Sequence, residues 1–533
     1  MNCRALAPDR LPHTSKLYRD FVGNFSKLKS FYGHPPELKS VVSVAKKLSF
    51  PGERRREVAD ILRQQNVIFG SGAETEKNRR RLENGAVAVV SGQQVGLFGG
   101  PAYSFYKALS AISAAEELTR GGIEAVPVFW MATEDHDVDE VRHTTWFHDG
   151  QLRGFELRKL ADDAQPVGRI PLGEEVTQLV REAESDLGQT FGDILRESYT
   201  PVATYSSAFA HLFARIFEDF GLILLDPLDE RLHRVAAPIL QRAVAERDEL
   251  NELLLKRGEE LEHAGYAVQV KVTARSTVLF SLCGGQRQVI SSANGQFISG
   301  QKVAPRDVWL REIESEPQCF SPNAIFRPVV QDYLLPTVAY FGGPAEIAYY
   351  AQSQVLYEKL LGRMPVILPR ADFTLVDPKA TRILKKYGLQ VEDTWEGKQQ
   401  LLKRMHAANV PKKLAREFDS NLRQLEKNLQ RLHKAIAKVD PTIQDTIARA
   451  EKRIRYQMEK LRQKTGASLD RRDKLVERHA ESLENLLYPQ KGLQSRDLCF
   501  LPFLARWGTG GLHELEKLAR PKKPGHHCIV PIP

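Results

Sequence analysis

The sequence predicts an α/β protein with a mostly parallel sheet, small inserted segments and an α-helical antiparallel coiled-coil domain. Three observations carry this prediction. Short apolar runs alternate with helical patterns, which is typical of a parallel sheet. A stretch with paired turn signals interrupts the alternation. A long seam of apolar residues at coiled-coil spacing follows near the C-terminus.

The first strand and helix are expected around residues 86–131. Residues 86–90 (AVAVV) form a buried strand, a glycine-rich turn covers 91–101, and Pro101 opens a helix that ends at Gly121-Gly122. A second strand over 125–131 completes a right-handed βαβ unit. The remaining strands of the sheet are expected at 222–226, 336–341 and 365–369.

Residues 1–376 are expected to form this core, with insertions at about 150–205 and 240–320. Within the second insertion, residues 266–298 alternate in polarity, and Gly284-Gly285 and Asn294-Gly295 supply turn signals. Alternating runs joined by such turns predict antiparallel hairpins.

Residues 377–490 are expected to be a helical coiled-coil domain, and 491–533 to pack back on the core. One apolar seam runs from Leu414 to Val439 and resumes from Ile443 to Leu461, with a helix corner at Asp440-Pro441. These two helices form an antiparallel hairpin, and its outer apolar surface predicts a homodimer.

Composition and charge argue against a membrane protein, a disulfide-rich protein and a nucleic-acid-binding protein. No apolar run approaches the ~20 residues that span a bilayer, so we expect no membrane partner. The five cysteines lie far apart, which indicates neither a disulfide framework nor a metal site and favours a cytoplasmic protein. The net charge of +9 equals the excess of 21 Lys+Arg over 12 Asp+Glu in residues 401–490. Because aromatic residues are scarce there, this is interpreted as a solvated helical surface rather than a nucleic-acid face.

The strongest candidate site is the turn at 91–101. Glycines at four positions allow sharp bends and close approach of backbone N–H groups to a ligand, and the following helix start favours an anion. Gln93 and Gln94 add neutral amides. The predicted ligand-binding glycines are Gly92, Gly96, Gly99 and Gly100. The competing interpretation is a turn that is merely tight.

A second candidate is the acidic stretch 134–140, which follows the next strand. Its carboxylates could hold Mg²⁺, neutralise a substrate ammonium, or tune His136 as a general base, with Asp135 and Asp137 beside it. The alternative is an acidic helix start. Both candidate stretches should face one cavity, since parallel strands end at a shared edge.

A third group lies around two later glycine- and proline-bounded loops. Asn323 and Arg327 could contact an anion, and the Gly342-Gly343-Pro344 turn repeats the strand-to-helix pattern, with Glu346 able to bind an amine. A structural ion pair and a helix cap are the competing interpretations. The terminal His526-His527-Cys528 is interpreted as part of a disordered tail.

Taken together, these motifs resemble a known family. The runs VVSGQQVGLFGGPAYSFYKALSAI, VPVFWMATEDHDVDEV, FRPVVQDYLLPTVAYFGGPAEIAYYAQ and ENLLYPQKGLQSRDLCFLPFLARWG resemble the cysteine ligase family of bacillithiol biosynthesis (BshC). The resemblance implies a Rossmann-like core and a dimerising coiled coil. It also implies that L-cysteine is joined to the amine of glucosaminyl-malate in the last step of the pathway.

Amide formation of this kind requires an activated carboxyl group, for which ATP or another nucleotide with Mg²⁺ could serve as co-reactant, although the sequence does not identify the cofactor; no Cys/His set near the loops indicates zinc. His136, Asp135, Asp137 and Gln94 are the candidate catalytic residues, and Tyr488 and Arg496 could line a nucleotide pocket. Two other functions fit the same features: a class I synthetase-like enzyme acting on tRNA, and a non-catalytic, nucleotide-sensing assembly protein.

Overall fold

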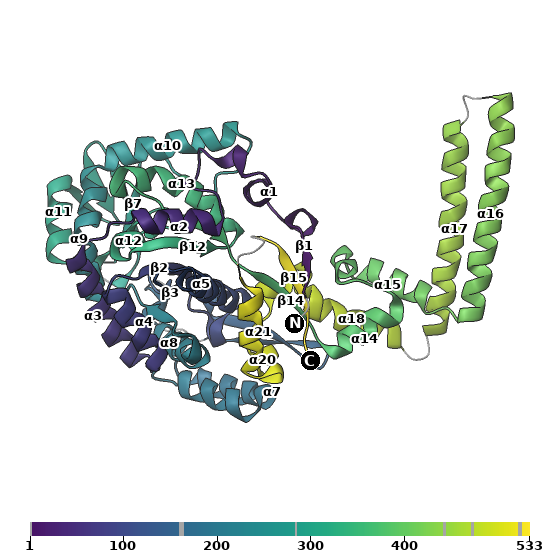
Figure 1. The fold of residues 1–533 in the computed structure, drawn as a ribbon, viewed down its shortest axis with the longest axis horizontal. Helices are drawn as coiled ribbons and strands as arrows, with labels where there is room; N and C mark the ends of the chain where they lie inside the picture. The colour runs from purple at the N-terminus through teal and green to yellow at the C-terminus, as the bar shows by residue number, and fades with distance from the viewer. Residues whose placement is uncertain (1–2, 159–164, 283–284, 441–443, 471–473, 521–524) are drawn as a thin grey trace. The chain divides into compact units, whose positions relative to one another are not determined.

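A computed structural model describes residues 3–158, 165–282, 285–440, 444–470, 474–520 and 525–533. The chain divides into two compact units. The core unit comprises Met1–Trp146, Arg153–Thr374 and Ser495–Val530, and the helical unit comprises Phe147–Leu152, Leu375–Gln494 and Pro531–Pro533. Figure 1 shows the elements of each unit.

A five-stranded parallel sheet lies at the centre of the core unit. Its strand order is β13-β12-β2-β3-β6, with the bounds Val366–Pro369, Thr337–Gly342, Val87–Gln93, Ala125–Met131 and Ile223–Leu225. All four strand pairs are parallel. Strand β3 is buried along its whole length, as expected for a parallel sheet covered on both faces. The predicted α/β fold with a parallel sheet is confirmed.

The two faces of this sheet bury different helices. Val87 and Val89 pack with residues of α5 (Ala102–Arg120) and α2 (Leu38–Lys47). Ala88 and Val90 point the other way, into the larger cluster that includes α13 (Pro344–Leu361). Alternate residues of one strand therefore serve two cores, which follows from the two-residue period of a β-strand.

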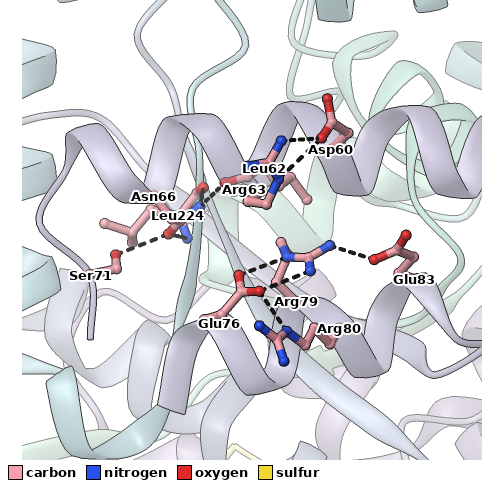
Figure 2. Close-up of polar contacts among 10 residues, drawn as sticks. All are labelled: Asp60, Leu62, Arg63, Asn66, Ser71, Glu76, Arg79, Arg80, Glu83 and Leu224. Carbon is pink, nitrogen blue, oxygen red and sulfur yellow. Dashed lines mark hydrogen bonds and ion pairs between the residues drawn. The ribbon is translucent and has the colours of Figure 1, made fainter. Parts of the chain in front are cut away.

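Two of the N-terminal helices, α3 (Gly52–Ile68) and α4 (Ala73–Glu83), lie at the β6 edge of the sheet, whereas α1 (Lys16–Gly23) packs against α13. The Asn66 side chain on α3 accepts a hydrogen bond from Leu224 N (3.0 Å) and donates one to Leu224 O (2.8 Å), as Figure 2 shows. Gln65 makes the same pair of contacts with the backbone of Asp226. Two side-chain amides thus occupy the open edge of β6, where a neighbouring strand would otherwise pair.

The connection from β3 to β6 carries the first insertion. Its elements are α6 (Val138–Val141), the paired strands β4 (His143–His148) and β5 (Gln151–Glu156), α7 (Glu175–Ser198) and α8 (Tyr205–Ile216).

The connection from β6 to β12 is longer and contains helices α9 to α12 and a second sheet. The helices are α9 (Glu230–Ala245), α10 (Arg247–His263), α11 (Arg306–Ser315) and α12 (Arg327–Leu334). The sheet has the order β10-β9-β8-β7-β11, with the bounds Lys302–Pro305, Gln296–Ser299, Gln288–Ala293, Ser276–Ser281 and Phe320–Pro322. All of its pairs are antiparallel.

The hairpin prediction for this region holds in part. Asn294 (φ 52°) and Gly295 (φ 74°) form the turn between β8 and β9, as the sequence indicates. Gly284 lies outside the described residues. The predicted strand at the start of 266–298 is wrong. There, the backbone N–H and C=O of Val270 pair with the Gln352 side chain (2.9 and 2.8 Å), so this segment needs no strand partner.

The helical unit contains the predicted coiled coil. Its helices are α14 (Pro378–Tyr387), α15 (Lys398–Ala408), α16 (Lys412–Val439), α17 (Gln444–Asp470) and α18 (Leu475–Leu487). Helices α16 and α17 pack on each other, and ion pairs such as Arg455–Glu426 (2.7 Å) join them. Pro441, at the predicted corner, lies outside the described residues.

The end of the chain corrects two expectations. After α19 (Gln494–Asp497), α20 (Leu501–Trp507) and α21 (Gly510–Leu518), strand β15 (His527–Pro531) pairs with β1 (Arg4–Leu6). His527 is buried, with its ring between Asp372 (2.9 Å) and Thr374 (2.7 Å), so its expected place in a disordered tail is wrong. Cys528 is disulfide-bonded to Cys3, although the wide spacing of the cysteines predicted no such pairing. Among the described residues, no helix has the length and apolarity that crossing a membrane requires.

Candidate functional site

A cavity of about 600 Å³ lies in the core unit, at the carboxyl ends of the parallel strands. Residues from the loops after β2, β3 and β12 line it, together with residues from the second insertion. Strand β2 is connected onward to β3 on one side and lies beside β12 on the other. The cavity therefore lies where the strand order reverses, which is the usual ligand position in open α/β sheets.

The first half of the 91–101 turn faces this cavity. Gly92 must be glycine, since a Cβ there would lie 2.5 Å from the carbonyl oxygen of Trp130. The Gln93 amide is held at both ends: its oxygen accepts from Lys107 Nζ (2.7 Å), and its nitrogen donates to the Tyr103 hydroxyl (3.2 Å). Gln94 donates to Asp135 Oδ2 (2.8 Å). The 91–101 turn and the acidic stretch therefore meet at one cavity, as the strand pattern predicts.

The second half of this turn is packed against protein instead. Gly96, Gly99 and Gly100 are buried and do not line the cavity. The N–H of Gly99 donates to the Tyr199 hydroxyl (3.1 Å), and Ala102 N, at the start of α5, donates to Leu498 O (2.8 Å). The expected anion cradle at this helix start is thus not formed, because other parts of the chain already use its donors.

The acidic stretch separates into residues with different surroundings. Asp135 is half-buried and accepts from Gln94 and from Arg287 Nη1 (3.3 Å). Burial alone would raise the pKa of Asp135. Hydrogen bonds from His136, the positive charge of Arg287 and the hydrogen bond from Gln94 outweigh burial and lower the pKa to about 2. His136 and Asp137 are exposed and do not line the cavity; Asp137 instead caps α6 by accepting from Glu140 N (3.2 Å).

Glu134 has the opposite environment. It is 7% exposed, lines the cavity and makes no hydrogen bond to another described residue. Burial is the largest of the effects that raise the pKa of Glu134 to about 8. The charge of Arg287 opposes this rise, the charge of Asp226 adds to it, and the charge of Arg327 opposes it. The ring of His233 lies 3.5 Å away, and burial lowers the pKa of that imidazole to about 4. The pKa values of these two adjacent carboxyl groups are thus shifted in opposite directions, that of Asp135 below its ordinary value and that of Glu134 above it.

The carboxylates of the stretch do not converge on a common point. Asp135 bonds to Arg287, Asp137 caps α6, and Asp139 pairs with Arg142 (3.2 Å). In the part of the chain that the structure describes, no cluster of three or more His, Cys, Asp or Glu side chains has the arrangement of a metal site. The surroundings of these residues therefore do not support a magnesium site built from the stretch itself.

The later loops contribute two lining residues with distinct roles. Asn323 caps the turn before α12, because its Oδ1 accepts from the N–H groups of Ile325 (3.1 Å) and Phe326 (3.0 Å). The guanidinium of Arg327 donates to Gln331 Oε1 (2.9 Å) and to the Tyr349 hydroxyl (3.4 Å), both neutral. No carboxylate of the described residues lies within 4.0 Å of Arg327, so it is not part of a structural ion pair with them.

The Gly342-Gly343 turn is built around Glu346. Glu346 accepts from the Tyr340 hydroxyl (2.6 Å) and from Gly343 N (2.8 Å), and it pairs with Lys107. These donors support the helix-cap interpretation of Glu346; because Glu346 also lines the cavity, its contact with a substrate amine stays a prediction. Gly343 lines the cavity, whereas Gly342 is buried beneath it.

The two residues proposed for a nucleotide pocket lie in different units. Arg496 lines the cavity of the core unit and is exposed. Tyr488 is buried in the helical unit, 4% exposed. Their joint role in nucleotide binding stays a prediction.

Sequence reasoning missed several lining residues, notably Tyr103, Lys107, Arg287 and Arg370. Lys107 had a signal in the sequence: it is the only charged residue in the stretch 102–115, which is otherwise made of apolar, tyrosine and serine residues. Arg370 had one too, since it directly follows β13 at the cavity edge of the sheet. Arg287 lies just before β8, in a segment where only the hairpin was predicted.

Two family models match the chain. One, described as "Bacillithiol biosynthesis BshC, N-terminal Rossmann-like domain", matches residues 1–371, and the other, the corresponding "C-terminal coiled-coil domain", matches residues 373–530. The chain belongs to the BshC family. The BshC fold therefore accounts for both the Rossmann-like sheet and the helical unit.

Individual relatives agree with this membership. A protein of Koribacter versatilis named "Putative cysteine ligase BshC" is 41% identical over 95% of each chain. A Solibacter usitatus protein of the same name is 38% identical over 95% of this chain and 96% of its own. One from Chlorobaculum tepidum is 31% identical over 90% of this chain and 89% of its own. This BshC chain is thus similar to its relatives through both units.

Proposed function

We propose that this BshC-family protein is a ligase that joins the carboxyl group of L-cysteine to the amine of glucosaminyl-malate in the last step of bacillithiol biosynthesis. The cavity of the core unit is the proposed active site. The observation that carries the proposal is the position of this cavity: it lies at the carboxyl ends of β2, β3 and β12 and collects charged groups of both signs. The name shared by the relatives supplies the reaction class.

The chemistry sets what this site must do. A carboxylate is a poor acyl donor, so its oxygen must leave on an activating group, for which a nucleoside triphosphate is the expected co-substrate. The amine nitrogen then forms the new C–N bond and loses a proton. Holding the two reactants in place and stabilising charge supply most of the acceleration in such reactions.

The lining residues can be assigned to these tasks. Gln94, Asp135 and Arg287 form a hydrogen-bonded chain in which Asp135 stays ionised. A fixed anion at this point can orient an incoming amine. Arg327, with neutral hydrogen-bond partners, is available to an anionic group of a substrate. His136, outside the cavity lining, is in this proposal no longer the leading candidate for the base.

The test is a reaction with purified protein, L-cysteine, glucosaminyl-malate and each nucleoside triphosphate in turn. Product is detected by mass spectrometry, and released pyrophosphate or orthophosphate identifies the activation route. Asp135→Asn is expected to lower kcat/KM by about 100-fold or more, as the loss of a buried charged contact does. Asp139→Asn, an exposed carboxylate on the same stretch, serves as the matched control. Failure of the purified protein to form product with any nucleotide, or full activity of Asp135→Asn, contradicts the proposal.

A further inference from the structure

The cationic residues that line the cavity differ in whether the protein neutralises them. Lys107 pairs with Glu346, Arg287 with Asp135, Arg370 with Asp372 and Arg247 with Asp248. Lys271 and Arg496 have no carboxylate within 4.0 Å among the described residues, but both are exposed, so water solvates them. Arg327 is the half-buried exception.

Arg327 is surrounded by aromatic rings and neutral groups. Its guanidinium carbon lies 5.8 Å from the Trp130 ring and 5.6 Å from the Tyr340 ring, and its hydrogen bonds go to an amide oxygen and a phenol. A guanidinium in such surroundings lacks the counter-charge that buried cations ordinarily have. An anionic ligand in the cavity would supply it.

Glu134 is the complementary group. It follows β3 four residues after Trp130, and it is buried apart from the part that lines the cavity. Its nearest nitrogen partner is the uncharged imidazole of His233, and no Lys or Arg of the described residues lies within 4.0 Å of its carboxyl group. The other lining acids are either paired, as Asp135 and Glu346 are, or exposed, as Glu140 is.

One cavity thus contains one carboxyl group without a cation and one guanidinium without an anion. A ligand with an ammonium and a carboxylate on the same carbon satisfies both, because its carboxylate supplies the anion that Arg327 lacks and its ammonium supplies a cation that stabilises the ionised form of Glu134. We propose that Glu134 and Arg327 form the two ends of an α-amino acid subsite, with Glu134 receiving the ammonium and Arg327 the carboxylate. This inference rests on the proposed function, in which the amino acid is L-cysteine.

In this subsite, different residues of the cavity bind the two substrates. Arg327 would hold the carboxyl group that is to be activated, through the two-pronged contact that a guanidinium makes with a carboxylate. The hydrogen-bonded chain of Gln94, Asp135 and Arg287 would remain for the amine of the second substrate. Because burial raises the pKa of Glu134, an ammonium bound beside its carboxyl group would favour release of the proton.

The test removes each charge from the protein and, separately, from the ligand. Binding is measured by calorimetry for L-cysteine, for cysteamine, which lacks the carboxylate, and for 3-mercaptopropionate, which lacks the amine. The proteins are the wild type, Arg327→Met, Arg327→Lys and Glu134→Gln. Glu230→Gln and Arg234→Met, both exposed on α9, are the matched controls.

Arg327→Met is expected to weaken binding of L-cysteine and 3-mercaptopropionate about 10- to 100-fold and to leave cysteamine unchanged. Arg327→Lys should recover part of the loss. Glu134→Gln is expected to weaken L-cysteine and cysteamine by a similar factor and to leave 3-mercaptopropionate unchanged. The wild type should release a proton with L-cysteine, seen as a binding enthalpy that depends on the buffer.

Three results overturn the subsite. They are no L-cysteine binding to the wild type at millimolar concentration, equal losses for all three ligands in either variant, and unchanged L-cysteine binding in Arg327→Met or Glu134→Gln. Since binding is measured without turnover, the two proposals fail separately. A protein that shows the expected ligand pattern but makes no amide refutes the ligase and leaves the subsite intact.

Discussion

Lys107 and Glu346 form a buried ion pair between α5 and the first turn of α13. Lys107 Nζ also donates to the carbonyl of Gly92 (2.7 Å) and to Gln93 Oε1 (2.7 Å), while Glu346 also accepts from Tyr340 and Gly343. Burial alone would raise the pKa of Glu346, but the Lys107 ammonium and the Gly343 amide hold it below its ordinary value. The pair therefore connects the loop after β2 to the loop after β12 at the cavity.

Removing one member of this pair should be costly. Lys107→Met leaves Glu346 buried without its cation, so we expect the free energy of unfolding to fall by about 3–5 kcal/mol in urea titrations. Lys77→Met removes an exposed lysine paired with Glu74 and should cost less than about 1 kcal/mol. The double variant Lys107→Met/Glu346→Gln should lose less than the sum of its single changes. Additive losses would show that the two side chains do not interact.

The raised pKa of Glu134 predicts a pH-dependent stability. Between its ordinary pKa of 4.5 and about 8, the folded protein holds this proton and the unfolded chain has lost it. Raising the pH through this window therefore destabilises the wild type, by at most about 1.4 kcal/mol per pH unit from this group. Glutamine is neutral throughout, so Glu134→Gln should lose less stability between about pH 5.5 and about pH 7.5.

Urea unfolding of both proteins at these two pH values measures the difference. Glu230→Gln, an exposed change on α9, should follow the wild type. If Glu134→Gln follows it as well, the carboxyl group is ionised in the folded protein and the interpretation of its surroundings is wrong.

The edge of the sheet at β6 gives a third prediction. Asn66→Ala leaves the N–H and C=O of Leu224 without their partner in a buried position, which should lower the free energy of unfolding by about 1–3 kcal/mol. Arg63→Ala changes a half-exposed residue of the same helix, whose partner Asp60 is on the surface, and should stay within about 0.5 kcal/mol. Equal effects of the two changes would show that Asn66 does not substitute for a strand here.

The sheet was predictable from sequence because its signals are local. Each strand is a short, nearly continuous apolar run, and helical patterns between the runs require parallel crossovers. The same rule places the residues after each strand at one edge, which is why Gln94 and Asp135 could be expected together. The Asn294-Gly295 turn was also predictable from the sequence, since its conformation depends on those two residues alone.

The rest depended on partners far away in the chain. A glycine-rich turn looks the same whether its N–H groups face a ligand or a phenol, and only the fold shows that Tyr199 occupies the donor of Gly99. Likewise, nothing local shows that Lys107 neutralises Glu346 while Arg327 has no carboxylate partner. The sequence alone places His527 in a tail, because the segment that buries it, around Asp372, is distant in sequence.

The coiled coil predicts self-association. Helix α16 has no fully buried residue, and apolar side chains of both long helices are exposed, including Leu432 and Leu461 at 54% each. An apolar seam of this length covered on one side only is expected to bury its remaining surface against a second copy of the chain, as in an assembly of paired hairpins. We therefore propose a homodimer formed by α16 and α17.

Leucine-to-glutamate changes test the dimer. Leu432→Glu/Leu461→Glu places charges in the expected interface, where burial without a partner is costly, so light scattering after gel filtration should show the mass fall from that of two chains to one. Gln430→Glu adds a charge at an exposed polar position of α16 and should leave the mass unchanged. Circular dichroism checks that both variants keep their helices. If the wild type has the mass of a single chain, no surface joins two copies. If the dimer survives both leucine changes, these leucines face water and another surface joins the two copies.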